Sequence, residues 1–324
     1  MSVAPAPATH NSGREYARPV ETLRVSTRSD HETLVEIQNA AIPDDPIDVE
    51  DHLGFLRSCR EHESFLVLED DRVVGAAVVA IEHTRDIPYA HLWVEPASRC
   101  RGAGSALYAD VSEWARERGH TQLEVPVRDD DAESLAFAQK RGFVEDGREE
   151  GLVLELAGTE QPAVETPEGV EIVTWAERPE LARGIYEVAL EALPDVPGEE
   201  DYAVEPFDDW LEHEMSGPGD RPEATFVALA GDEVVGYAKF SLTEAQAATA
   251  HHDLTGVKRA WRGRGVARAL KARQIAWAKE NGYREIRTRN ERRNEPIRRL
   301  NARFGYRPAP GRIYLRGPLS GSGP

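Results

Sequence analysis

Cysteine is scarce in this chain of 324 residues, and long apolar runs are missing. The two cysteines, Cys59 and Cys100, exclude a disulfide scaffold and a cysteine-based structural zinc site. No segment approaches the roughly 18 consecutive apolar residues that a membrane helix requires. The first 19 residues lack the apolar stretch of a signal peptide. We therefore expect a cytoplasmic protein, and the sequence predicts no metal site.

What the chain does contain is charge and enough apolar material for a core. The composition is 40% hydrophobic and 30% charged, with a net charge of -19, which is typical of a globular protein. The length favours two domains. Basic residues gather between 256 and 316, which predicts an anion-binding surface or, alternatively, a solvated helical face. The overall negative charge disfavours nucleic acid as a partner.

The chain is an internal repeat with an offset of 163 residues. Leu92–Leu107 aligns with Thr255–Leu270, and both segments carry an arginine-rich glycine loop. Each is preceded by an apolar hairpin with an acidic turn, at 65–75 and at 226–236. Each is followed by the pattern of a helix, a strand and a second helix. The two halves therefore share one plan.

The repeat predicts the domain organisation and the fold class. Residues 157–169 are polar, carry two prolines and show no periodicity, which indicates a linker. Each half has the pattern of a strand, one or two helices, three strands in a meander, a helix, a strand, a helix and closing strands. This order predicts an α/β fold with a mixed sheet. The predicted segments are a disordered tail 1–19, a first domain 20–156, the linker 157–169, a second domain 170–319 and a tail 320–324.

The repeated loops have the chemistry of a phosphate site. In each half a strand ends at Val94 or Val257, a glycine loop follows, and a helix begins near Gly104 or Ala267. Such a junction aims backbone N–H groups at one point at the positive end of a helix dipole. Glycine is needed because a Cβ atom would block the approach. A structural turn is the alternative for one loop alone, but two matched loops favour a phosphate-bearing ligand.

Other well-known motifs are missing from the sequence. The nucleotide P-loop and the dinucleotide-binding glycine spacing are both absent. His213-Glu214 lacks a second histidine at helical spacing, so no zincin motif is present. Ser105 lacks the flanking glycines of a nucleophile elbow.

With its loops Arg99-x-x-Gly102-x-Gly104 and Arg262-x-x-Gly265-x-Ala267, the sequence resembles the GNAT superfamily of N-acetyltransferases in a tandem arrangement. The resemblance covers about Leu23 to Leu319. It implies two splayed β-sheets flanked by helices, with acetyl-CoA as cosubstrate and the CoA pyrophosphate held by the loops. The residues it assigns to CoA are Val94, Arg99, Arg101, Gly102, Ala103 and Gly104, and Val257, Arg262, Gly263, Arg264, Gly265, Val266 and Ala267.

One family feature is missing, because the tyrosine that often protonates the CoA thiolate is replaced by Ala138 and Asn301. A thiol has an ordinary pKa of about 8.5, so thiolate can leave near neutral pH with help from water or Asn301. Acyl transfer therefore remains the expected reaction.

The reaction needs a group that removes a proton from the amine nucleophile, and candidates for this role occur only in the second half. Strand alternation places His251, Asp253 and Thr255 on one face there, whereas the matching face of the first half carries Pro88, Ala90 and Leu92. His251 and Asp253 can accept a proton, so they are the candidate catalytic residues, with Asn301 as a helper. The alternative for His251 and Asp253 is a polar edge strand. For His91, His252 and Cys100, structural roles are favoured.

The acceptor is expected to be a small cationic amine. The segment from Asp195 to Asp209 mixes carboxylates with Tyr202 and Phe207, which suits a cation with an apolar body, although an acidic solvated surface is equally consistent. The predicted function is N-acetylation of a primary amine of a small molecule. We expect the second domain to catalyse the reaction and the protein to be a monomer or a homodimer. The alternative is a non-catalytic acyl-CoA-binding module.

Overall fold

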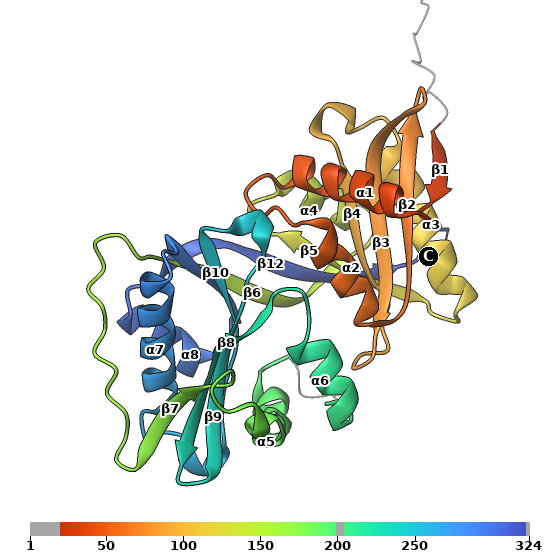
Figure 1. Ribbon diagram of the computed structural model, residues 1–324. Coiled ribbons are helices and arrows are strands. Elements are labelled where there is room, and N and C mark those ends of the chain that lie inside the picture. The colour runs from red at the N-terminus through yellow and green to blue at the C-terminus, as the bar shows by residue number, and fades with distance from the viewer. Residues whose placement is uncertain (1–19, 199–203, 322–324) are drawn as a thin grey trace, which may run out of the picture.

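The computed structural model describes residues 20–198 and 204–321 (Figure 1). The first half contains β1 (Glu21–Arg24), α1 (Arg28–Ala41), α2 (Val49–Arg57), β2 (Cys59–Glu69), β3 (Arg72–Glu82), β4 (Tyr89–Val94), α3 (Ala103–Glu117), β5 (Gln122–Arg128), α4 (Ala132–Gln139) and β6 (Val144–Glu155). The second half contains β7 (Val170–Thr174), α5 (Ala182–Ala192), α6 (Phe207–Met215), β8 (Asp220–Ala230), β9 (Glu233–Ser241), β10 (Thr249–Val257), α7 (Val266–Glu280), β11 (Glu285–Glu291), α8 (Glu295–Arg303) and β12 (Arg307–Pro318).

Local sequence explains where the first two helices begin. Thr27 and Asp48 cap α1 and α2, and in each case the acid three residues later, Asp30 or Asp51, bonds back to the cap backbone. These reciprocal capping boxes satisfy N–H groups that would otherwise lack partners. The loop between α1 and α2 is thereby fixed at both ends.

The twelve strands of the described residues form one sheet, in the order β1-β2-β3-β4-β5-β12-β6-β11-β10-β9-β8-β7. The two halves exchange their last strands. β12, at the end of the chain, lies between β5 and β6 of the first half, and β6 pairs with β11 of the second half. Figure 1 shows β12 running beside β5 at the junction of the halves. The exchange joins two repeated units through continuous backbone hydrogen bonding.

Helices cover both faces of the sheet in each half. The core under α3 contains Leu107 and Trp114, and the matching core under α7 contains Leu270 and Ile275. On the opposite face, α1 and α2 pack over the first half, and α5 and α6 over the second. The predicted α/β class with a mixed sheet flanked by helices is confirmed.

The sheet opens in both halves where the parallel strands meet. β4 and β5 pair only at Tyr89 and Glu124, and β10 and β11 pair at three positions before they diverge. β10 also carries a β-bulge between His252 and Thr255, whereas β4 pairs with β3 in unbroken register. No helix among residues 20–198 and 204–321 is long and apolar enough to cross a membrane. Residues 157–169 contain no helix or strand.

Candidate active site

The two glycine loops have the same backbone geometry. Gly102 and Gly265 begin α3 and α7 with φ of 109° and 92°, and no side chain caps either helix. Cys100 and Gly263 also match, with φ of 61° and 73°. A Cβ atom built on Gly102 or Gly263 would meet no atom within 4 Å, so the space in front of these residues is open. Both helix N-termini therefore present N–H groups to an anion.

The leading arginine of each loop bonds to the preceding strand. Arg99 Nε donates to the Val94 carbonyl at 3.3 Å, and Arg262 Nε donates to the Val257 carbonyl at 3.0 Å. Carboxylates then occupy the free ends of these guanidinium groups, Glu133 in the first half and Asp195 in the second. The loops are thus held in place before any ligand binds.

A cavity of about 1960 Å³ lies between the halves, and we call it the chamber. Its first-half wall includes Arg99, Cys100 and Gly102 of the first glycine loop, and we call this loop and its counterpart in the second half the anion loops. Val94 at the end of β4, Gly104 in α3 and residues of α4 lie beside them. Its second-half wall includes the ends of α6 and β9 and residues 251–253 of β10. Among the described residues, those of loop 259–267 do not line it. The chamber therefore joins the first anion loop to the strand face of the second half.

A buried lysine organises the second-half wall of the chamber. Lys239 Nζ lies 2.7 Å from Asp220 and 2.9 Å from Asp253, and it also donates to the Glu214 carbonyl. Burial opposes its charge, but Asp253 and Asp220 hold the pKa of Lys239 above its ordinary value. Burial and the neighbouring Asp253 raise the pKa of the Glu214 carboxyl to about 7. Two carboxylates thus pair with one ammonium group, and the carboxyl group of Glu214 lies close enough to both to feel their charge.

His251 and Asp253 have different partners. His251 Nε2 lies 3.0 Å from Gln246 Oε1, whereas Asp253 pairs with Lys239. Burial, aided by Arg289, lowers the pKa of His251 to about 4, so its imidazole is neutral near pH 7. Both residues line the chamber, but no contact joins them directly in the manner of a dyad.

The bulge in β10 overturns one expectation about the strand faces. Thr255 lies opposite Ala238, which belongs to the core under α7, so Thr255 does not share a face with Asp253. Leu254 packs toward α5 and α6 instead. Strict alternation fails because a bulge inserts one extra residue.

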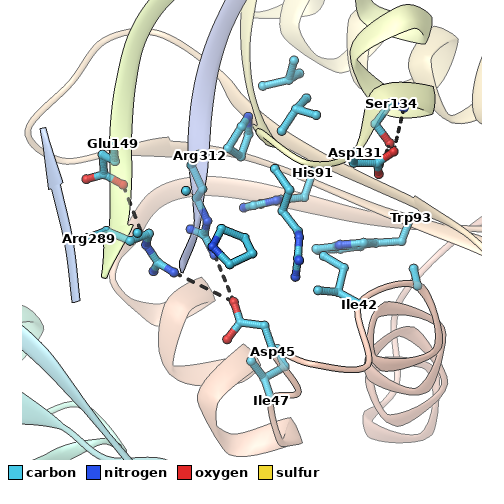
Figure 2. A pocket seen from close by; sticks show the side chains of 18 of the residues that line it. Ile42, Asp45, Ile47, His91, Trp93, Asp131, Ser134, Glu149, Arg289 and Arg312 are labelled. Atoms are coloured by element: carbon cyan, nitrogen blue, oxygen red, sulfur yellow. Dashed lines mark hydrogen bonds and ion pairs between the residues drawn. The ribbon is translucent and has the colours of Figure 1, made fainter. Parts of the chain in front are cut away.

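Because of this bulge, the part of β10 that precedes it has its faces reversed relative to the equivalent part of β4. Ala90 and Leu92 pack under α3, whereas His91 and Trp93 lie on the face toward α1 and α2. His91 stacks on Trp93 with ring centroids 5.1 Å apart (Figure 2). Burial and the nearby Arg312 lower the pKa of His91 to about 3. A histidine therefore faces the chamber from the first half too, which strand alternation had missed.

Asn301 lies in α8 and is completely buried against β11. Its Nδ2 donates to Asn290 Oδ1 at 2.7 Å, and its Oδ1 has no hydrogen-bond partner. His252 is also buried, stacks on Phe240 and contacts the Tyr306 hydroxyl at 2.6 Å. Cys100 is exposed.

Two arginines from the exchanged-strand region face the chamber (Figure 2). Arg289 and Arg312 converge on Asp45 of the α1–α2 loop at 3.9 and 3.6 Å, and Arg289 lies 3.8 Å from Glu149. The sequence did not identify this group, because the strand exchange is what brings β11, β12 and β6 to the α1–α2 loop. Lys239 was not identified either, although a single lysine in an otherwise apolar strand is a local signal that could have indicated it.

The acidic segment from Asp195 to Asp209, which was expected to suit a cationic acceptor, is only partly described. Glu199, Glu200, Asp201 and Tyr202 lie outside the described residues. Asp195 pairs with Arg259 and Arg262, and hydrogen bonds from these arginines hold its pKa below the ordinary value. Asp208 and Asp209 are exposed at the start of α6 and are not among the residues that line the chamber.

Each half thus places a strand that splays from its parallel neighbour in front of an uncapped helix that begins behind a glycine turn. The model of the acetyltransferase (GNAT) family matches the chain twice, at residues 31–143 and 182–306. The chain therefore belongs to the GNAT family, and its tandem arrangement is confirmed. No match was found among the curated proteins.

Solved structures with a similar fold span both halves. A tandem GNAT protein from the clavulanic acid biosynthesis pathway has a TM-score of 0.76 at 22% identity, over 94% of this chain and 100% of that one. A GCN5-related N-acetyltransferase from Sphaerobacter thermophilus has a TM-score of 0.71 at 23% identity, over 93% and 96%. At these identities the likeness concerns the fold.

Proposed function

We propose that the protein is an acetyl-CoA-dependent N-acetyltransferase acting on a small cationic amine, and that the second half carries out the chemistry. Attack of an amine on a thioester requires alignment of the two groups, a donor for the developing oxyanion and removal of a proton. Each requirement has a counterpart in the chamber.

The observation that carries this proposal is the bulge in β10. Two residues there oppose one residue of β9, and a bulge of this kind leaves its extra residue out of the ladder. We infer that a backbone N–H group beside Asp253 is thereby available. An N–H at the mouth of a splayed strand pair suits an oxyanion donor. β4 keeps its regular pairing with β3, so it offers no released N–H of this kind.

The proton leaves through His251 and Asp253 in this proposal. His251 is neutral near pH 7 because its pKa is about 4, so its imidazole has a lone pair available. Asp253 is a chamber carboxylate beside the bulge, and a water molecule can link it to the amine. Asn301 is buried, does not line the chamber and already donates its Nδ2 hydrogen to Asn290, so we assign protonation of the CoA sulfur to water and not to Asn301.

The acceptor's positive charge is matched by the wall around Lys239. Glu214, Asp220 and Asp253 give this wall more carboxyl than ammonium groups, which favours a cationic substrate. This wall replaces the segment 195–209 as the basis for a cationic acceptor, since Asp195 is engaged by arginines and Asp208 is exposed.

Thiol release from acetyl-CoA with a panel of amines tests the proposal. We expect turnover with diamines or amino sugars, and little with anionic or neutral acceptors. Absence of turnover across the panel, together with tight acetyl-CoA binding by calorimetry, would favour the non-catalytic acyl-CoA-binding module. That alternative is supported by one observation, the carboxylates already bound to Arg99 and Arg262.

A further inference from the structure

Three metal-ligating side chains meet where the two halves touch. His83 directly follows β3 of the first half. In the second half, Glu205 lies just before α6 and His213 lies within it. His213 Nδ1 lies 3.0 Å from Glu205 Oε2, and His83 Nδ1 lies 3.5 Å from Glu205 Oε1. One ligand atom from each residue lies within 4.8 Å of the other two. The imidazole rings stack with centroids 4.8 Å apart.

These separations suit one metal ion. Zinc binds histidine nitrogen and carboxylate oxygen at about 2.0–2.2 Å, so two ligands of a tetrahedral site lie about 3.3 Å apart. The nitrogen–oxygen distances of 3.0 to 3.5 Å in the cluster bracket that value. The ligand nitrogens of the two histidines lie within 4.8 Å of each other, so an ion can enter if the imidazole rings turn toward it.

Packing fixes the ligands from the second half. The Glu205 carbonyl accepts a hydrogen bond from the Tyr186 hydroxyl at 2.7 Å, and Tyr186 packs against Trp210. Trp210 is buried and anchors the helix that carries His213. The ligand side chains remain open to solution, with 34% of His83, 18% of His213 and 10% of Glu205 exposed.

We propose that His83, Glu205 and His213 bind a divalent metal ion of the Zn²⁺ type, which clasps the two halves together at the edge of the chamber. The donor set of two imidazoles and a carboxylate is one that zinc commonly uses, with a fourth position left for water. His213 also lines the chamber, so the ion would lie beside the carboxyl-rich wall formed by Glu214, Asp220 and Asp253. That wall favours a dication.

This site departs from the prediction of no metal site, which considered only local spacing. His83 lies more than a hundred residues before its partners, and His213-Glu214 by itself has no metal motif. The fold brings the three ligands together from separate segments, so no short-range sequence pattern predicts the site.

Titration of the chelator-treated full-length protein with Zn²⁺ alone tests the clasp. We expect one equivalent to bind the wild type, and the affinity of that equivalent to fall at least about tenfold in His83→Ala and in His213→Ala. His120→Ala, which alters a histidine outside the cluster, is the matched control and should bind as the wild type does. Zn²⁺ should also raise the Tm of the wild type and the control but not that of His83→Ala.

Two results would overturn the clasp. One is the failure of wild-type protein to bind Zn²⁺, which would leave a hydrogen-bonded cluster only. The other is unchanged binding in both His83→Ala and the milder Glu205→Gln, which would place the ion elsewhere. Because His83 is on the surface, its replacement should not prevent folding. None of these measurements depends on acyl transfer, so the clasp and the proposed function can fail separately.

Discussion

The two halves keep the same anion loop but differ in the strand that leads into it. Gly102 and Gly265 adopt matching conformations, and Arg99 and Arg262 make the same bond to the preceding strand. β4, in contrast, is regular and mostly apolar, whereas β10 is bulged and borders Lys239 and its carboxylates. The backbone geometry of the loop is thus the same in both halves, whereas the strand before it differs, and the proposed function assigns the acceptor to that difference.

Divergence is also visible where the halves meet. Glu149 and Arg312 are 163 residues apart, occupy equivalent positions in the repeat, and face each other directly across β6 and β12. In two identical copies these positions would hold like charges. In the fused chain they hold opposite charges, which favours the pairing of exchanged strands.

Among the residues of the chamber, we expect the largest loss of activity from replacing the proton acceptors of β10. The His251→Ala, Asp253→Ala double variant should lose about a hundredfold or more in kcat while keeping its affinity for acetyl-CoA, because a general base contributes on that scale. His91→Ala, on the chamber face of the first half, is the matched control and should lose far less. Steady-state thiol release measures both, and the reverse order of effects would assign the chemistry to the first half.

A smaller effect concerns the acceptor wall. Glu214→Gln should raise KM for a diamine several-fold with little change in kcat, because it removes one carboxyl group that attracts the cation. Added salt should raise KM in the wild type, and less so in the variant. The control is Glu212→Gln on the exposed part of the same helix. Equal KM values in all three proteins would exclude this wall as the cation site.

A stability difference between equivalent core positions should be smaller still. Lys271 in α7 is equivalent in the repeat to Tyr108 in α3. Burial lowers the pKa of Lys271 to about 7. Between pH 7 and its ordinary pKa near 10.5 the unfolded chain binds more protons at this lysine, so the stability of the wild type rises with pH there. Lys271→Met should therefore raise Tm by about 2–4 °C at pH 6.5 and by less at pH 9.5. An equal gain at both pH values would contradict the buried charge.

The sequence was sufficient for the repeat, the anion loops and the mixed α/β fold, because glycine spacing and hydrophobic periodicity are local. It could not reveal the strand exchange, since β6 and β12 have the same pattern and either can complete either half. It also misaligned the faces of β4 and β10, because one extra residue in the bulge reverses the alternation. The wall around Lys239 and the pair Arg289 and Arg312 depend on contacts between distant segments.

Matched glycine variants distinguish which half carries out acyl transfer. Gly265→Val and Gly102→Val place the same side chain at equivalent positive-φ positions in the two anion loops. With circular dichroism confirming that both variants fold, acetyl-CoA-dependent thiol release is measured with the best amine. We predict that Gly265→Val abolishes turnover and that Gly102→Val retains most of it. Full turnover in Gly265→Val with loss in Gly102→Val would contradict this prediction and place the chemistry in the first half.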